Sequence, residues 1–285
     1  MWQKHLPDEW PSSGRRMTTT LDNILAFKRQ EVAERKRHLD EDALVARLET
    51  MGDSPRGFFA ALRERAAGGK AAMIAEILRA APYSGVLRED FDAAAIARQL
   101  AANGATCLSV LTDKKFFMGN DIYLRQVRQA TNLPVLRKDF IVDSYQVVES
   151  RVLGADAIWL IVAALSDDAL REYTLLAHDL GMDVLAEVSD EAELERALQL
   201  PLRTIAANNR RAPDFAVDLD FSARVQARLP GDYLLVSEHG LRSHDDIRAL
   251  QEKGVQAFLA GGVLMQENDP GAALGKLMGG DKHGE

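Results

Sequence analysis

Short apolar runs alternate with amphipathic segments along most of the chain. Such runs, mostly aliphatic and bounded by polar residues, are typical of parallel strands that are buried on both faces. They predict strands over residues 73–77, 107–111, 135–138, 157–161, 184–188, 204–208, 233–238 and 257–260. Apolar residues spaced three, four and seven apart predict helices over residues 91–102, 123–130, 145–153, 167–180, 191–198, 221–228 and 244–253. Eight strands that alternate with helices over ~200 residues predict an α/β fold, a closed (β/α)8 TIM barrel.

A doubly wound open sheet is the alternative fold. That fold normally has a glycine-rich first turn, and residues 77–80 (Ile-Leu-Arg-Ala) contain no glycine. Further helices are predicted from Leu21, over residues 41–49 and over residues 58–66, all before the first strand. We therefore divide the chain into a loose N-terminal extension (1–20), a helical appendage (21–70), the barrel (71–280) and a short tail (281–285).

Composition narrows the class of protein. The 285 residues are 47% hydrophobic and 27% charged, which is ordinary for a globular chain. The net charge of -8, without a block of Lys and Arg, argues against a nucleic-acid partner. The single cysteine, Cys107, lies in a predicted buried strand, which fits a reducing cytoplasm. No apolar run approaches the ~20 residues of a membrane span, and the start lacks the apolar core of a secretion signal. We expect a cytoplasmic monomer or weak homodimer with no membrane contact.

The carboxyl ends of barrel strands meet at one mouth, where barrel enzymes place their chemistry. The residues at or near these predicted ends are Glu76, Leu78, Lys138, Trp159, Glu187, Asn208, Arg210, Glu238, His239, Gly261 and Gly262. Buried charges are costly unless they are paired or used. Lys138 beside Glu187 or Glu76 would form an acid and a base whose pKa values are set by each other and by burial. The six histidines are scattered without ligand spacing, so we expect no metal and no cofactor.

Several runs of the chain match one enzyme family. They are Cys-Leu-Ser-Val-Leu-Thr-Asp (107–113), Phe-Phe-Met-Gly (116–119), Leu-Arg-Lys-Asp-Phe (136–140), Leu-Ile-Val-Ala-Ala-Leu (160–165), Asn-Asn-Arg (208–210), Val-Ser-Glu (236–238) and Asp-Pro-Gly-Ala-Ala-Leu (269–274). From about Leu21 to Met278 the chain resembles indole-3-glycerol-phosphate synthase, which closes an indole ring on a phosphorylated anthranilate derivative with loss of carbon dioxide and water.

The resemblance implies a role for each matched residue. Lys138 would be a general acid and Glu187 a general base. Glu76 and Asn208 would support them, and Glu238 would be a further active-site carboxylate.

The departures from the family fall on the predicted mouth. The family usually has Glu-Ile-Lys followed by Ser-Pro-Ser, whereas this chain has Glu-Ile-Leu (76–78) and Ala-Pro-Tyr (81–83). The family's Ser-Glu-Ser-Gly is Ser-Glu-His-Gly (237–240) here, its Gly-Glu-Ser is Gly-Gly-Val (261–263), and Trp159 replaces a leucine. The family's valines are Ala186 and Ala260, and its Gly-Ile pair is Ala-Ala (206–207).

These departures predict a pocket that is more aromatic and less suited to anions. The loss of even two charge-assisted contacts, at about 1.5–3 kcal/mol each, would weaken an anionic substrate substantially. Binding of a substrate phosphate would then depend on backbone amides near Gly240, Gly261 and Gly262.

Our first hypothesis is a retargeted, engineered barrel enzyme. It would remove a proton from a small, flat, neutral aromatic substrate, as in ring opening of a benzisoxazole (Kemp elimination), with Glu187 as base. Trp159 would offer a stacking face, and Lys138, His239 or Tyr83 would stabilise an oxyanion. Glu76 and Glu238 are rival bases.

Three alternatives stay open. One is the family reaction itself, an indole-forming lyase that tolerates Leu78. Another is a Schiff base on Lys138 for retro-aldol cleavage, which nearby carboxylates oppose by keeping the amine protonated. The last is a binding barrel without turnover, in which replacement of Glu187 would leave affinity largely unchanged.

Overall fold

The computed structural model describes residues 20–82, 84–210 and 216–280. Its central element is a closed barrel of eight parallel strands in the order β1-β10-β9-β8-β7-β6-β5-β4. The strands are β1 (Ala72–Ile77), β4 (Cys107–Leu111), β5 (Val135–Lys138), β6 (Ala157–Ile161), β7 (Asp183–Val188), β8 (Thr204–Asn208), β9 (Leu234–Glu238) and β10 (Ala257–Ala260). The predicted TIM barrel is confirmed, and closure between β1 and β4 rules out the open sheet.

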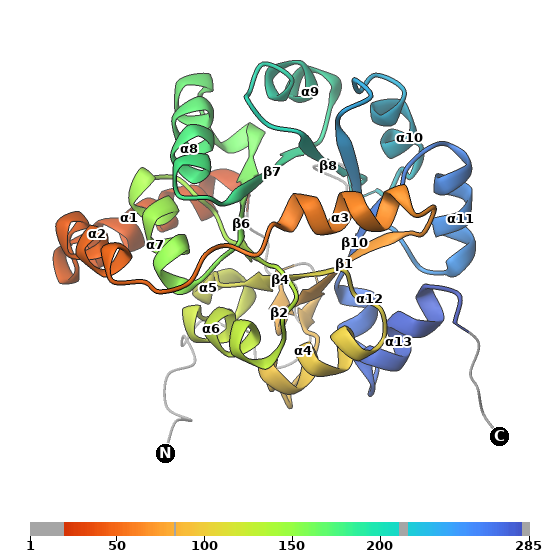
Figure 1. Cartoon of the computed structure of the whole chain (residues 1–285), viewed down its shortest axis with the longest axis horizontal. Helices are drawn as coiled ribbons and strands as arrows, with labels where there is room; N and C mark the ends of the chain where they lie inside the picture. The colour runs from red at the N-terminus through yellow and green to blue at the C-terminus, as the bar shows by residue number, and fades with distance from the viewer. Residues whose placement is uncertain (1–19, 83, 211–215, 281–285) are drawn as a thin grey trace.

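Helices surround the barrel (Figure 1). The helices are α4 (Ala93–Ala102), α6 (Asp121–Ala130), α7 (Ser144–Leu153), α8 (Asp167–Asp179), α9 (Glu191–Ala197), α10 (Asp220–Gln226), α11 (His244–Glu252) and α13 (Pro270–Leu277). The sequence patterns predicted neither α13 nor the shorter elements, and the shorter elements have too few residues for a periodic pattern. These are the hairpin β2 (Ala80–Ala81) and β3 (Gly85–Val86), α5 (Lys114–Phe117), the 3-10 turn η1 (Val162–Ala164) and α12 (Gly262–Met265).

Three helices precede β1, as the sequence predicts: α1 (Leu21–His38), α2 (Glu41–Glu49) and α3 (Phe58–Ala67). Figure 1 shows α3 lying across the barrel. Its Phe58 and Leu62 are buried in the cluster that fills the barrel interior, and the carboxylate of Asp183 accepts a 2.8 Å hydrogen bond from the backbone N–H of Phe59. Helix α3 therefore closes the end of the barrel where the strands begin. The assignment of residues 21–70 to a separate appendage stays a prediction.

Strand geometry determines which side chains enter the barrel. Successive side chains of a strand point to opposite faces, so alternate residues face the interior and the helices. On β5, Leu136 belongs to the interior cluster, whereas Arg137 bonds to Gln146 and Ser150 of α7. Lys138 therefore points into the barrel, at the end where β5 stops.

No helix among the described residues is long and apolar enough to cross a membrane.

Candidate active site

Lys138 lies at the centre of an ion-pair group at the mouth. Its Nζ is 2.8 Å from Oε1 of Glu76 on β1 and also bonds to Oε1 of Glu238 on β9. Burial alone would lower the pKa of Lys138, but the charges of Glu238, Glu76 and Glu187 outweigh burial and raise the pKa well above its usual value. Lys138 is therefore held as a protonated cation that can donate a proton or stabilise an anion.

Glu187 at the end of β7 belongs to a second, hydrogen-bonded group. Its Oε1 accepts from Nδ2 of Asn208 at 2.7 Å, and its Oε2 accepts from Nε1 of Trp159 at 2.7 Å. Burial, followed by the charge of Glu238, raises the pKa of Glu187 to about 7, although Lys138 and the two hydrogen bonds act in the opposite direction. A carboxylate with this pKa accepts protons effectively near neutral pH.

His239 follows β9 and lies beside this cluster. Its Nε2 is 3.3 Å from Oε1 of Glu238. Burial, and then the charges of Lys138 and Arg210, hold the pKa of His239 well below its usual value, so the imidazole is neutral. Its backbone has φ = 64°, a left-handed conformation that is uncommon for residues other than glycine and that clusters at functional sites.

Glycines allow the chain to approach the site closely. A Cβ on Gly261, after β10, would lie 2.9 Å from Cδ2 of Leu78 and would collide with Glu76. Gly240 has φ = 90°, and a Cβ there would meet Val217 and Leu219. Leu78 itself is buried, so an apolar side chain fills the position where the resembling family has a lysine.

The structure brings together most of the residues expected at the mouth. Of the two carboxylates expected beside Lys138, Glu187 and Glu76, it is Glu76 that pairs with it, and Glu238 pairs with it as well. Glu187 accepts hydrogen bonds from Asn208 and Trp159. The backbone N–H of Arg210 donates to Oδ1 of Asn208 at 2.9 Å, which places Arg210 beside the same group. Gly262 begins α12. Tyr83 lies outside the described residues.

Two predictions about the shape of the pocket need correction. Trp159 lies in the middle of β6 rather than at its end, and it is only 1% exposed, so it offers no open stacking face. Ala186 and Ala260 belong to the cluster that includes helix residues, because Leu185 and Leu259, their neighbours in the strand, occupy the interior. These two alanines therefore pack against helices and do not enlarge the pocket.

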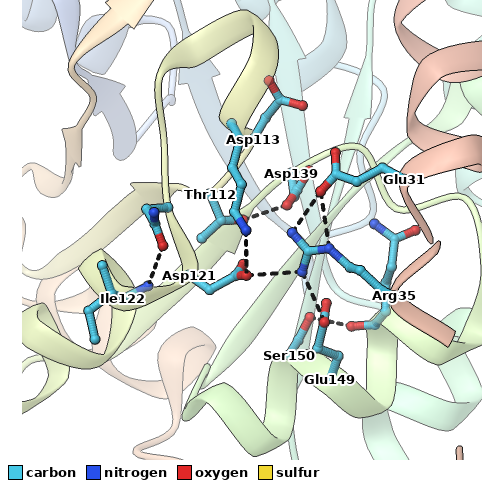
Figure 2. Close-up of polar contacts among 12 residues, drawn as sticks. Glu31, Arg35, Thr112, Asp113, Asp121, Ile122, Asp139, Glu149 and Ser150 are labelled. Carbon is cyan, nitrogen blue, oxygen red and sulfur yellow. Dashed lines mark hydrogen bonds and ion pairs between the residues drawn. The ribbon is translucent and has the colours of Figure 1, made fainter. Parts of the chain in front are cut away.

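Sequence reasoning missed a charge network behind β5. The ammonium group of Lys28 on α1 is 1% exposed and lies 2.8 Å from Asp113 and 2.9 Å from Asp139. Thr112 donates to Asp139 at 2.6 Å. Figure 2 shows the neighbouring Arg35 of α1 between Glu31, Asp121 and Glu149. The network joins α1 to the ends of β4 and β5, and thus to the backbone on both sides of Lys138.

One feature of the sequence could have indicated this buried charge network. Lys28 shares the spacing of the apolar residues Ile24, Leu25 and Val32, so a charged residue lies on the buried face of a helix. Such a lysine requires buried carboxylate partners.

Across the described ranges, no group of His, Cys, Asp and Glu has the arrangement of a metal site. A protonated lysine between two carboxylates, beside a third carboxylate with a near-neutral pKa, defines a barrel enzyme that works by general acid–base catalysis.

Comparison with known proteins specifies the family. The family model described as indole-3-glycerol phosphate synthase matches residues 21–277. A relative from Dichelobacter nodosus with that name is 49% identical over 264 residues, which are 93% of this chain and 99% of the relative. A second, from a Polaromonas species, is 47% identical and covers 93% of this chain and 100% of the relative. The chain belongs to the indole-3-glycerol phosphate synthase family, and it is an enzyme of the lyase class.

Solved structures agree with the fold. The tryptophan synthase alpha subunit from Legionella pneumophila matches with a TM-score of 0.59 at 14% identity, over 80% of this chain and 98% of that one. A 3-hexulose-6-phosphate synthase matches with a TM-score of 0.58 at 15% identity, over 73% of this chain and 99% of that one. At such identities the likeness shows the barrel alone.

The comparisons overturn the first functional hypothesis. Relatives that are 47–49% identical over 93% of this chain carry the synthase name. The prediction of an engineered barrel that opens a benzisoxazole ring is therefore wrong, and the indole-forming alternative agrees better with these findings. Two of the departures from the family, Ala186 and Ala260, do not face the mouth.

Proposed function

We propose that this protein is an indole-3-glycerol phosphate synthase, which closes an indole ring on a phosphorylated anthranilate derivative and releases carbon dioxide and water. One observation carries the proposal: a protonated Lys138 and a Glu187 whose pKa is about 7 lie at the same mouth. Ring closure needs a proton for the carbonyl oxygen, which becomes a hydroxyl, and loss of carbon dioxide then restores the aromatic ring. Dehydration needs a second proton, so that the hydroxyl leaves as water, and a base for a proton released from the new ring.

Lys138 is the proposed general acid. Its ammonium group is fixed between Glu76 and Glu238, so it can donate toward a substrate oxygen without first changing its rotamer. The two carboxylates make the ammonium a weak acid in the free enzyme. Its first contribution is therefore electrostatic, because the cation stabilises negative charge that develops on the carbonyl oxygen.

Glu187 is the proposed general base. Asn208 and Trp159 fix both of its oxygens, which sets the direction of the remaining lone pairs. Glu238 is the proposed substrate-contacting carboxylate, because its Oε2 is buried and has no hydrogen-bond partner among the described residues. A buried acceptor of this kind favours a substrate that brings an N–H or O–H group.

Anionic groups of the substrate require donors. Arg210 and His239 lie beside the cluster, and we assign the phosphate to the backbone amides near Gly240, Gly261 and Gly262, which need no charged side chain. The apolar side chain of Leu78 predicts weaker affinity for the anionic substrate than a lysine at that position would give.

Product formation from the phosphorylated anthranilate derivative tests the proposal. We expect indole absorbance to appear with the purified protein and to fall at least a hundredfold in Lys138→Met and in Glu187→Gln, since general acid–base groups contribute about 10²–10⁴-fold. Matched controls are Lys253→Met, which alters an exposed residue just after α11, and Glu195→Gln, which alters an exposed residue on α9. No indole product from the unmodified protein, or full activity in both site variants, would refute the proposal.

A further inference from the structure

Trp159 lies between the proposed acid and the proposed base. Its indole N–H donates to Oε2 of Glu187 at 2.7 Å, and Nζ of Lys138 is 4.3 Å from the centroid of its ring. Both contacts involve one rigid side chain that is 1% exposed and packed in the barrel interior. The indole therefore has a fixed orientation toward two ionisable groups of opposite charge.

Strand register explains this arrangement. Trp159 pairs with Leu185 and Ile161 pairs with Glu187, so Trp159 lies one interior layer below the carboxylate. From this layer the N–H edge points up to Glu187, while one face of the ring lies against Lys138. A leucine, which is usual at this position in the family, offers neither a donor nor a π face.

We propose that Trp159 is a positioning residue that holds Glu187 and Lys138 in their charged forms and couples them electrostatically; this inference rests on the proposed function. A cation over the face of an indole withdraws electron density from the ring and makes its N–H a stronger donor. A carboxylate on the N–H has the opposite effect on the ring and makes the face more attractive to the cation. Each charge therefore stabilises the other through the ring.

Other groups around Glu187 act alongside the indole. Asn208 of β8 donates to Oε1, Lys138 of β5 attracts the carboxylate, and Glu238 of β9 repels it. Glu76 of β1 pairs with Lys138, and His239 is neutral. Because desolvation and Glu238 favour the protonated carboxyl, the N–H of Trp159 is one of the few contacts that keep Glu187 ionised.

An indole N–H resonance tests the contact without any turnover. The chain has three tryptophans, at positions 2, 10 and 159, so the variant Trp2→Phe/Trp10→Phe has a single indole signal. We expect this ¹⁵N–¹H signal to move with a midpoint near pH 7 as Glu187 is protonated, and to stay constant in the same variant carrying Glu187→Gln. A signal that is constant between pH 5 and pH 9, or that moves equally without Glu187, would overturn the inference.

Kinetics test the consequence for catalysis. Trp159→Phe keeps a ring near Lys138 but removes the donor, so the lower pKa in the kcat/KM profile should rise by about one unit, with a fall in kcat larger than the change in KM. Trp159→Leu should shift the profile in the same direction. An unchanged profile in a folded Trp159→Phe variant would contradict the inference. If no form of the protein made indole product, the proposed function would fail, and the resonance titration would still decide the role of Trp159.

Discussion

At the scale of single residues, Leu78 puts an apolar side chain at the position where the family resemblance implies a lysine. Leu78 lies against Glu76 and Gly261, and a lysine at this position would place its ammonium group near Glu76 and the substrate's anionic groups. We expect Leu78→Lys to raise kcat/KM for the phosphorylated anthranilate derivative about tenfold, because one charge-assisted contact contributes about 1.5–3 kcal/mol. Leu78→Met is the control, since it keeps length without charge. Equal kinetics in the two variants would show that this position does not contact an anion.

Residue identity alone did not predict where Trp159 lies. The alternation of β6 puts residues 157, 159 and 161 on one face, so its inward direction could be inferred from sequence. Its depth depends on the pairing of Ile161 with Glu187 between neighbouring strands, and no local pattern encodes that register. The same holds for the Lys138 ion pairs, which join residues that are far apart in the chain.

At the scale of elements, helix α1 holds the strand end that carries Lys138. Lys28 is buried between Asp113 and Asp139, so Lys28→Met leaves the buried carboxylate of Asp113 without the cation that pairs with it, whereas Asp139 keeps its contact with Arg137. We expect a loss of about 3–5 kcal/mol in the free energy of unfolding by urea. Part of this loss should return in Lys28→Met/Asp113→Asn, which removes one carboxylate.

An exposed cation of the same helix provides the matched control. Arg37 is 74% exposed and pairs with Glu34, and exposed pairs of this kind contribute about 0–1 kcal/mol. Arg37→Met should therefore leave stability nearly unchanged. Equal losses in Lys28→Met and Arg37→Met would show that the buried network does not anchor α1.

Most of the strands and helices could be predicted from the sequence. Five of the eight strands begin and end as predicted, because apolar runs flanked by charges match strands buried on both faces. The predicted helix at residues 91–102 begins later, since Asp92 caps α4 by accepting from the N–H of Ala95. The hairpin of β2 and β3 was missed because each strand has two residues.

At the scale of the whole molecule, burial of the single cysteine reports on barrel integrity. Cys107 is fully buried on β4, its thiol donates to the backbone O of Phe58 at 3.7 Å, and burial raises its pKa. We expect a thiol reagent at pH 8 to label Cys107 only as fast as the barrel opens, and urea to accelerate labelling. Rapid labelling of the native protein would contradict a closed barrel that α3 covers.

The molecule as a whole and its mouth both have an excess of negative charge. The chain has a net charge of -8, and the described mouth sets Lys138 and Arg210 against Glu76, Glu238 and Glu187. A mouth of this kind repels an anionic substrate at long range, so association should accelerate with added salt at low ionic strength. Stopped-flow binding at increasing salt measures this, and a rate that falls with salt would show that cations dominate the approach.

The dependence of kcat/KM on pH tests the central claim most directly, because it reports the essential acid and base of the free enzyme. The base must be ionised, and the pKa of Glu187 is raised to about 7, so activity should be lost as pH falls through this value. We expect kcat/KM for the phosphorylated anthranilate derivative to be level above pH 8 and to fall about tenfold per unit below pH 6. A profile that stays level from pH 5 to pH 8 would contradict the assignment of Glu187 as the base.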